Sequence, residues 1–375
     1  MRPIQMVDLQ LQYAKIKDAV DAGIQEVLDN ASFINGKAVS DFSNGLANYL
    51  GAKYVVPCAN GTDALQIAMM ALDLQPGDEV ITPSFTYVAT TEVIALLRLK
   101  PVFVEVDAKT FCIDPAAIEA AITPKTKAIV PVHLYGQSAD MEAVMQIAKK
   151  HNLFVIEDNA QAIGSDYTFK DGTTRKTGTI GTIGTTSFFP SKNLGCYGDG
   201  GAMCTDDEAL ANKLRMIANH GQSKRYYHDM VGCNSRLDSM QAAVLNVKLP
   251  LLDTYISARR SAADFYDKAF QSNKKISTPF RSLNSRHVFH QYTLTLDGVD
   301  RDGLNQYLAD KKIPSMIYYP VPAHRQQMFA AFGGGDYVLK TTDWLTERVI
   351  SLPMHTELDQ EQLEFITSNV LSYIS

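Results

Sequence analysis

The sequence predicts an α/β protein with a large domain built on a mainly parallel sheet and a smaller C-terminal α/β domain. Two observations predict it. Over residues 1–250, short apolar runs rich in Val and Ile alternate with stretches whose apolar residues recur at helical spacing. Strands that are apolar on both faces and separated by helices are what a parallel α/β sheet requires. After residue 250 the pattern changes, and 375 residues are enough for two domains.

The elements of the large domain follow in order along the chain. Apolar residues at helical spacing from Ile16 to Leu28 predict an amphipathic helix near the N-terminus. Four apolar runs predict buried strands, at Glu79–Thr82, Pro101–Val106, Ala128–Val132 and Leu153–Ile156. Four helical stretches alternate with these runs, at Ala64–Leu72, Glu92–Leu97, Ala116–Ala121 and Met141–Lys150.

The smaller domain begins with a long helical stretch around Ala258–Phe270. A strand at Gln291–Leu296, a helix at Gly303–Lys311 and a second strand at Ser315–Tyr319 complete a compact unit. Because no disordered linker separates the two parts, the boundary lies somewhere within Pro250–Pro279. We therefore expect domains of residues 1–250 and 251–375.

Composition excludes several classes of function. Hydrophobic residues make up 46% and charged residues 20%, which is typical of a globular protein rather than a disordered one. The net charge of −6 gives no nonspecific attraction to nucleic acid or to anionic lipid. No segment approaches the roughly 20 apolar residues of a membrane span, and no signal peptide is evident.

The cysteines and histidines indicate the compartment and the absence of a metal. Five cysteines without a CxxC pair predict buried free thiols in a reducing compartment. The one close histidine pair, His287 and His290, has no carboxylate motif beside it. We expect a soluble cytoplasmic protein that holds no metal.

The first candidate site is the segment Asn60–Asp63, immediately before the helix at Ala64–Leu72. A helix N-terminus offers unpaired N–H groups and the positive end of the helix dipole, both of which suit a phosphate. Gly61 lets a ligand approach the backbone, and Thr62 adds a hydroxyl donor. The same pattern also fits an ordinary helix cap.

The second candidate is Glu157–Gln161, directly after the apolar run Leu153–Ile156. Ligands of open parallel sheets bind at the carboxyl ends of strands, so Asp158 stands where chemistry usually occurs. A carboxylate there can hold a proton on a ring nitrogen, and Gln161 could reach a neighbouring oxygen. A solvated acidic turn is the alternative.

The third candidate is Lys192, within the segment Thr186–Ala202. Aromatic residues, Pro and Gly surround this lysine, which is an unusual setting for a surface charge. Desolvation would lower the pKa of its ammonium and make the amine a competent nucleophile for a carbonyl. Taken alone, a lysine is a surface charge far more often than a nucleophile.

Six motifs occur along the chain in a fixed order: NGTDAL, TPSFTYVAT, EDNAQ, SFFPSKNLGCYGDGGA, HGQ and NSRLDSMQAA. Together they resemble the DegT/StrS family of nucleotide-sugar aminotransferases, from Asp8 to about Leu358. The resemblance implies aminotransferase fold type I and the cofactor pyridoxal 5′-phosphate. It also implies a homodimer with shared active sites.

The resemblance assigns roles residue by residue. Lys192 would bind the cofactor covalently and catalyse proton transfer, while Asp158 would pair with the protonated ring nitrogen. The other cofactor contacts would be Gly61, Thr62 and Ser187 at the phosphate, Tyr87 on the ring face, Gln161 at the ring hydroxyl, and Asn234 reaching the phosphate from the partner subunit. Arg236, Tyr318 and Tyr319 would contact the substrate.

The expected reaction is amino transfer from L-glutamate to a nucleotide-linked ketosugar, for cell-surface polysaccharide or lipopolysaccharide biosynthesis. Within the family, the motifs look most like those of enzymes that aminate C3 of a UDP-2-acetamido-3-oxo sugar, such as the glucuronate. Tyr318-Tyr319 departs from them, because His-Tyr often stands there. Arg236 could pair with a glucuronate carboxylate, but relatives that act on uncharged sugars carry it as well.

Three alternatives remain. The ketosugar could be a dTDP-3-oxo- or 4-oxo-6-deoxyhexose. A sugar dehydratase of the same fold would carry histidine in place of Lys192, which argues against that reaction. A non-catalytic regulator or sugar-binding protein would share the fold without chemistry, but no helix-turn-helix pattern or basic face supports DNA binding.

Overall fold

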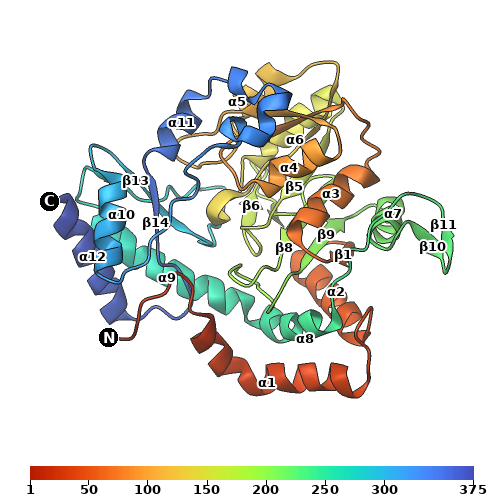
Figure 1. The fold of residues 1–375 in the computed structure, drawn as a ribbon, viewed down its shortest axis with the longest axis horizontal. Coiled ribbons are helices and arrows are strands. Elements are labelled where there is room, and N and C mark those ends of the chain that lie inside the picture. The colour runs from red at the N-terminus through yellow and green to blue at the C-terminus, as the bar shows by residue number, and fades with distance from the viewer.

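The computed structural model describes residues 1–375, and its centre is a seven-stranded sheet (Figure 1). In spatial order the strands are β1 (Tyr54–Cys58), β9 (Gly201–Thr205), β8 (Ile183–Ser187), β5 (Phe154–Asp158), β4 (Thr126–Ile129), β2 (Glu79–Pro83) and β3 (Lys100–Val104). Strand β9 runs antiparallel to both of its neighbours, and the other adjacent pairs are parallel. The predicted α/β class with a mainly parallel sheet is therefore confirmed.

Helices cover both faces of this sheet. They are α2 (Lys37–Leu50), α3 (Gly61–Ala71), α4 (Ala89–Leu96), α5 (Pro115–Ala121), α6 (Met141–His151), α7 (Glu208–Ala218), α8 (Ser239–Lys248) and α9 (Leu252–Phe270). Helix α1 (Leu9–Asp29) packs against α8. Neighbouring residues of one strand point to opposite faces. In β5, Ile156 packs in the core around α3, whereas Val155 packs in the core beside α5 and α6.

The helix ends follow from local sequence. Asp140 caps α6 by accepting a hydrogen bond from the Ala143 N–H at 3.2 Å. Asn152, in the left-handed conformation that asparagine tolerates, ends the same helix. Each helix predicted in the large domain is present, with ends that differ by a few residues, and α1 begins seven residues before Ile16 at Leu9. The sequence patterns do not predict α2, α7, β1, β8 or β9.

The C-terminal part has a core of its own. Its strands are β12 (Ile276–Ser277), β13 (Tyr292–Leu296) and β14 (Val349–Leu352), and its helices are α10 (Arg301–Asp310), α11 (Lys340–Thr346) and α12 (Gln360–Ile374). Helix α9 contributes Tyr266 and Phe270 to this core, which also receives Ile4 from the N-terminal segment. The division into residues 1–250 and 251–375 stays a prediction, since α9 runs from one part into the other.

The remaining elements are short. Two small hairpins consist of β6 (Asp166–Thr168) with β7 (Thr174–Lys176) and β10 (Gln222–Lys224) with β11 (Tyr227–His228). Short 3₁₀ helices occupy η1 (Leu134–Gly136), η2 (Leu249–Leu251), η3 (Ala323–Arg325), η4 (Gln327–Phe332) and η5 (Gly334–Asp336). The β10–β11 hairpin projects from the edge of the molecule, shown in green at the right of Figure 1.

The predicted strand at Ser315–Tyr319 is wrong. Only Met316 touches the sheet, through a pair of backbone hydrogen bonds to Ser351 in β14 at 3.1 and 2.7 Å. β14, which was not predicted, already pairs with β13. Pro320 and Pro322 lack the N–H group that a ladder needs, so the chain leaves the sheet here and turns toward the large domain.

All five cysteines are free thiols, and four of them are buried, as predicted; Cys233 is half-buried. None of the helices combines the length and the apolar character needed to cross a membrane.

Candidate active site

The predicted site residues of the large domain meet at the carboxyl ends of the central strands. Asp158 is the last residue of β5, and it pairs in the ladder with Thr185 of β8. Ser187 follows two residues later, at the end of β8. An open α/β sheet binds its ligands at this edge, so the topology brings together residues that are far apart in the sequence.

The N-terminus of α3 lies against this edge and leaves backbone donors free. The Asn60 side-chain oxygen accepts from the Asp63 N–H at 2.8 Å, and the backbone carbonyl of Asn60 accepts from the Ala64 N–H at 3.1 Å. The N–H groups of Gly61 and Thr62 therefore remain without an intrahelical partner. A Cβ placed on Gly61 would lie 2.7 Å from the Cβ of Ser187, so only glycine allows this close approach. The backbone at the start of α3 and the side chain of Ser187 thus lie against each other.

Asp158 is buried, with 6% of its surface exposed, and two donors hold its carboxylate. The hydroxyl of Thr90 donates to Oδ2 at 2.7 Å, and the N–H of Ala160 donates to Oδ1 at 3.1 Å. A solvated acidic turn, the alternative for this motif, is thereby excluded.

Lys192 stands on a tight loop that follows β8. The Cys196 N–H closes this loop by donating to the Phe188 carbonyl at 2.8 Å, and the Lys192 N–H donates to the Phe189 carbonyl at the same distance. The Lys192 side chain is half-buried. Burial lowers the pKa of its ammonium to about 8, and the nearby Asp158 carboxylate opposes part of that shift. This direction agrees with the predicted desolvation, and the lowered pKa leaves more of the amine neutral near physiological pH than in an exposed lysine.

Gln161 and the aromatic residues close the space above Asp158. The Gln161 Oε1 accepts from the Tyr135 N–H at 2.8 Å, which directs its Nε2 to the Tyr319 hydroxyl at 3.0 Å. Burial raises the pKa of Tyr319, so its phenol stays protonated. The ring of Tyr87 lies 6.1 Å from that of Tyr319 and is 56% exposed, which leaves its face free for a ligand.

Glu157, the neighbour of Asp158, points to the opposite face of β5 and is fully buried. Its carboxylate accepts from three backbone N–H groups of the following loop, at Gly178, Ile180 and Gly181, at 2.6 to 2.8 Å. His133 accepts from the Ala139 N–H through Nδ1, so its Nε2 carries the proton and donates to Glu157 at 2.9 Å. Burial by itself would raise the pKa of Glu157, but these donors outweigh it and hold the pKa below its ordinary value.

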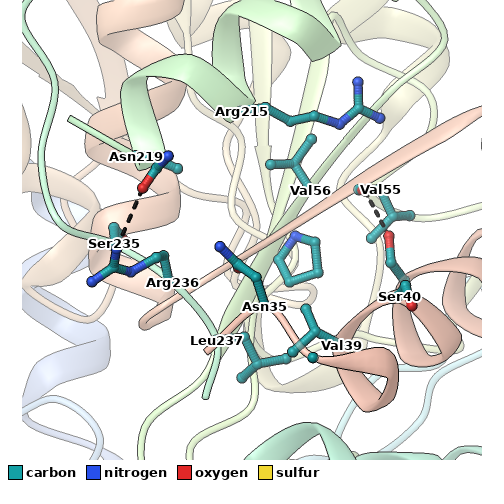
Figure 2. Close-up of a pocket in the computed structure, with 14 residues that line it drawn as sticks. Asn35, Val39, Ser40, Val55, Val56, Arg215, Asn219, Ser235, Arg236 and Leu237 are labelled. Carbon is teal, nitrogen blue, oxygen red and sulfur yellow. Dashed lines mark hydrogen bonds between the residues drawn. The ribbon is translucent and has the colours of Figure 1, made fainter. Parts of the chain in front are cut away.

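Asn234 and Arg236 do not join this group within one chain. Asn234 is exposed, and the guanidinium of Arg236 donates to the Asn219 side chain at 3.4 Å. Figure 2 shows Arg236 and Asn219 on the wall of a separate cavity of about 360 Å³, which α2, β1 and the end of α7 also line. Neither Asn234 nor Arg236 forms a hydrogen bond or ion pair with Lys192 or Asp158.

Tyr318 is half-buried beside Tyr319, and its carbonyl accepts a hydrogen bond from the Tyr135 hydroxyl. The segment that carries both tyrosines is fastened to the end of β2. The Ser84 hydroxyl lies 2.7 Å from the His324 Nδ1 and accepts from the His324 N–H at 3.0 Å. Tyr318 and Tyr319 are therefore held next to the segment that carries Tyr87.

Sequence reasoning did not identify Thr90, His324 or His290 as parts of the site. Burial lowers the pKa of His290, and the positive charge of Lys192 adds to this effect, so the imidazole is neutral. Thr86 and Thr90 are four residues apart in the motif TPSFTYVAT, but Thr86 precedes α4, so the spacing alone does not predict their contact. His324 and His290 gave no signal, since their contacts join distant parts of the chain.

The residues present fit pyridoxal 5′-phosphate, the cofactor that the resemblance implies. The backbone of Gly61, at the N-terminus of α3, lies against Ser187, so free backbone N–H groups stand beside a hydroxyl, which suits a phosphate. Asp158 supplies a buried carboxylate for a ring nitrogen, and Lys192 supplies an amine with a lowered pKa for an aldehyde. Each of these groups matches one end of the cofactor.

Three curated proteins are similar to this chain over nearly their whole length. UDP-2-acetamido-2-deoxy-3-oxo-D-glucuronate aminotransferase of Pseudomonas aeruginosa is 47% identical over 97% of this chain and 98% of its own. UDP-N-acetyl-3-dehydro-alpha-D-glucosamine 3-aminotransferase of Acidithiobacillus ferrooxidans is 45% identical, over 97% and 96%. A protein of Geobacillus stearothermophilus named a pleiotropic regulatory protein is also 45% identical, over 99% and 98%.

Solved structures share the fold. S. venezuelae DesV, in complex with a ketimine intermediate, superposes with a TM-score of 0.94 at 36% identity, over 100% of this chain and 99% of its own. NtdA from Bacillus subtilis, with bound cofactor PMP, superposes with a TM-score of 0.89 at 31% identity, over 98% and 83%. Residues 14–371 match the sequence profile of one family. With the fold, the arrangement of Lys192 and Asp158 and these similarities in agreement, the chain belongs to the DegT/DnrJ/EryC1/StrS aminotransferase family.

Proposed function

We propose that this protein is a pyridoxal-phosphate-dependent aminotransferase that aminates C3 of a UDP-linked 2-acetamido-3-oxo sugar, such as the glucuronate. The observation that carries the proposal is Lys192, whose amine has a pKa of about 8 and stands near the buried carboxylate of Asp158. Relatives at 45–47% identity whose names specify two such sugars support the substrate class.

The cofactor, when bound, supplies an electron sink for the negative charge that develops at the Cα of the amino donor. The protein's own groups do the rest. Asp158 holds the proton on the ring nitrogen, and Thr90 and Ala160 keep its carboxylate in place. Gly61, Thr62 and Ser187 bind the phosphate at the N-terminus of α3.

Lys192 has two tasks in this proposal. Its neutral amine would hold the cofactor through the aldehyde carbon, with release of one water, and, when freed by the amino donor, it would move a proton from the donor's Cα to C4′ of the cofactor. The lowered pKa suits both tasks, because it keeps the amine partly neutral near physiological pH. Tyr87 covers one face of the ring, and Gln161 and Tyr319 lie at the polar edge near Asp158.

We propose L-glutamate as the amino donor and cell-surface polysaccharide biosynthesis as the pathway class, both on the strength of the family resemblance. Arg236 would bind the sugar carboxylate or another anionic group, with Tyr318 and Tyr319 beside the sugar ring. A purely regulatory role is the second candidate, because one relative at 45% identity bears that name. The combination of Lys192, Asp158 and the phosphate cradle favours catalysis, since binding alone needs no reactive amine.

A substrate panel tests the proposed function. The protein loaded with the aminated cofactor should convert UDP-2-acetamido-3-oxo sugars faster than dTDP-3-oxo- or dTDP-4-oxo-6-deoxyhexoses, followed by absorbance and by mass spectrometry of the product. The reverse half-reaction with the corresponding amino sugars gives the same comparison from stable reagents. Faster conversion of a dTDP sugar would replace the proposed substrate, and conversion of none would favour the regulatory role.

We further propose a homodimer in which each site is completed by Asn234 and Arg236 of the other subunit. Within one chain Arg236 lines a separate cavity and Asn234 is exposed, although the resemblance assigns them to the substrate and the phosphate. A two-fold interface is isologous, so each subunit would both lend and receive this segment. Residues that make no contact with Lys192 in their own chain could then reach the Lys192 of the partner.

Mixed dimers test this sharing. Lys192→Ala and the double variant Asn234→Ala with Arg236→Ala should each be inactive alone. Unfolded, mixed and refolded together, they should regain about a quarter of the parental activity, because one site of each heterodimer carries no defect. Two different affinity tags verify that heterodimers form. Heterodimers that stay inactive would show that the residues act within their own chain.

A further inference from the structure

The motif TPSFTYVAT contains two threonines to which the assignments by resemblance give no role. Thr90 lies in the first turn of α4 and is 1% exposed, while Thr86 precedes that helix and is 4% exposed. The Thr90 hydroxyl lies 2.7 Å from the Asp158 Oδ2, and the Thr86 hydroxyl lies 3.1 Å from that of Thr90. A line of buried oxygen atoms thus ends on the carboxylate.

The direction of these hydrogen bonds follows from counting protons. A hydroxyl has one proton to donate, and an ionised carboxylate can only accept. Thr90 must therefore donate to Asp158, which leaves its oxygen lone pairs for Thr86. The chain runs from Thr86 to Thr90 to Asp158, and the geometry leaves no other direction.

The neighbouring threonine shows that this contact is not the ordinary behaviour of threonine in a helix. Thr91 is also fully buried, but its hydroxyl donates to the Val88 carbonyl at 2.9 Å, within its own helix. Threonine hydroxyls in helices commonly bond to a carbonyl in the preceding turn. Thr90 instead reaches from α4 to β5, a separation of 68 residues in the sequence.

We propose that Thr90 is a positioning residue for the cofactor's ring nitrogen, acting through Asp158, with Thr86 orienting the Thr90 hydroxyl. Asp158 holds one protein donor on each oxygen, Thr90 on Oδ2 and Ala160 on Oδ1. These two bonds fix the rotation of the carboxylate about its last torsion. Each oxygen keeps lone-pair capacity to accept one further donor. The inference rests on the proposed role of Asp158.

Thr90→Val removes the donor while keeping the shape, so it separates this role from packing. In the cofactor-free protein, we expect the dissociation constant for pyridoxal phosphate to rise by about tenfold, in line with a lost hydrogen bond to a charged group. The analogue in which a C–H replaces the ring nitrogen should bind to parent and variant equally, because Asp158 has no proton to hold there. Equilibrium binding followed by absorbance measures both.

Three further variants complete the test. Thr90→Ser keeps the hydroxyl and should restore parental affinity, and Thr91→Val, the matched control in the same helix, should change neither ligand's affinity. Thr86→Val should also raise the dissociation constant for pyridoxal phosphate, but by less than Thr90→Val does. It takes the place of Thr90→Val in the test if that variant does not fold. Equal weakening of both ligands, or no weakening of either, would overturn the proposal.

Asp158→Asn distinguishes failure of this inference from failure of the proposed function. One outcome is that Asp158→Asn weakens binding of pyridoxal phosphate but not of the C–H analogue, while Thr90→Val weakens both equally or neither. In that case Asp158 keeps its role at the ring nitrogen, and Thr90 is not a positioning residue. If Asp158→Asn binds both ligands as the parent does, the assignment of Asp158 to the ring nitrogen is itself wrong.

Discussion

Lys192→Ala should abolish amino transfer while leaving the protein folded. Alanine can neither attach the cofactor nor move the proton at the donor's Cα. The loss of a general base alone costs about 10²–10⁴-fold in rate, and the lost attachment adds to that. At pH values below about 8, Lys192 is charged in the folded protein, and burial of that charge lowers the free energy of unfolding. This destabilisation is lost as the pH rises from about 8 to 10.5, the ordinary pKa of lysine. The substitution therefore removes an unfavourable charge at neutral pH.

The measurement is the visible absorption band of the lysine-bound cofactor, recorded with turnover. In the parent, the band should form faster as the pH rises through about 8, because the neutral amine is the reactive form. The variant should show no band at any pH. Lys170→Ala, on an exposed turn, is the matched control and should behave as the parent. Appreciable turnover by Lys192→Ala without added amine would remove Lys192 from its catalytic role.

Asp158→Asn should lose most of the transfer rate, by about 10²-fold or more, the scale on which a single preorganised electrostatic group acts. The amide keeps the shape of the carboxylate but cannot balance a positive charge on the ring nitrogen. Steady-state rates should fall mainly in kcat, because the group acts on the reacting cofactor and not on the sugar.

The control for Asp158→Asn is Asp166→Asn, which removes a carboxylate from the half-buried ion pair with Lys176 at the surface. It should keep parental rates, and circular dichroism should report folded protein for both variants. Near-native activity of Asp158→Asn would mean that another residue, or none, holds the proton on the ring.

Much of the fold could be predicted because its signals are local. Runs such as Leu153–Ile156 are short and apolar on both faces, which favours a buried strand when helical stretches alternate with them. The strand predicted at Ser315–Tyr319 failed for a reason that is not local. β14 pairs with β13 there, and the tyrosines turn to a site formed by residues more than 150 positions earlier.

Some residues of the candidate site could likewise be predicted from local motifs, whereas others depend on contacts between distant segments. Lys192 and Asp158 stand in motifs that combine several unusual residues, so the resemblance and the strand-end rule both lead to them. The contact from Thr90 to Asp158 depends on how α4 packs against β5, which no short segment encodes. The hydrogen bond between the Ser84 hydroxyl and His324 likewise depends on how two segments that are distant in the sequence pack together. Partner-subunit roles for Asn234 and Arg236 stay predictions.

The two adjacent carboxylates of β5, Glu157 and Asp158, limit where this protein can tolerate an inserted or deleted residue. Asp158 faces the site, while Glu157 anchors the loop at Gly178–Gly181 on the other side of the sheet. Side chains alternate along a strand, so inserting or deleting one residue within β5 would exchange the two faces. A glutamate would then enter the site, and an aspartate, shorter by one methylene, would meet the loop. Surface turns can lengthen freely, but the residue count of β5 is tied to both the chemistry and the stability of the protein.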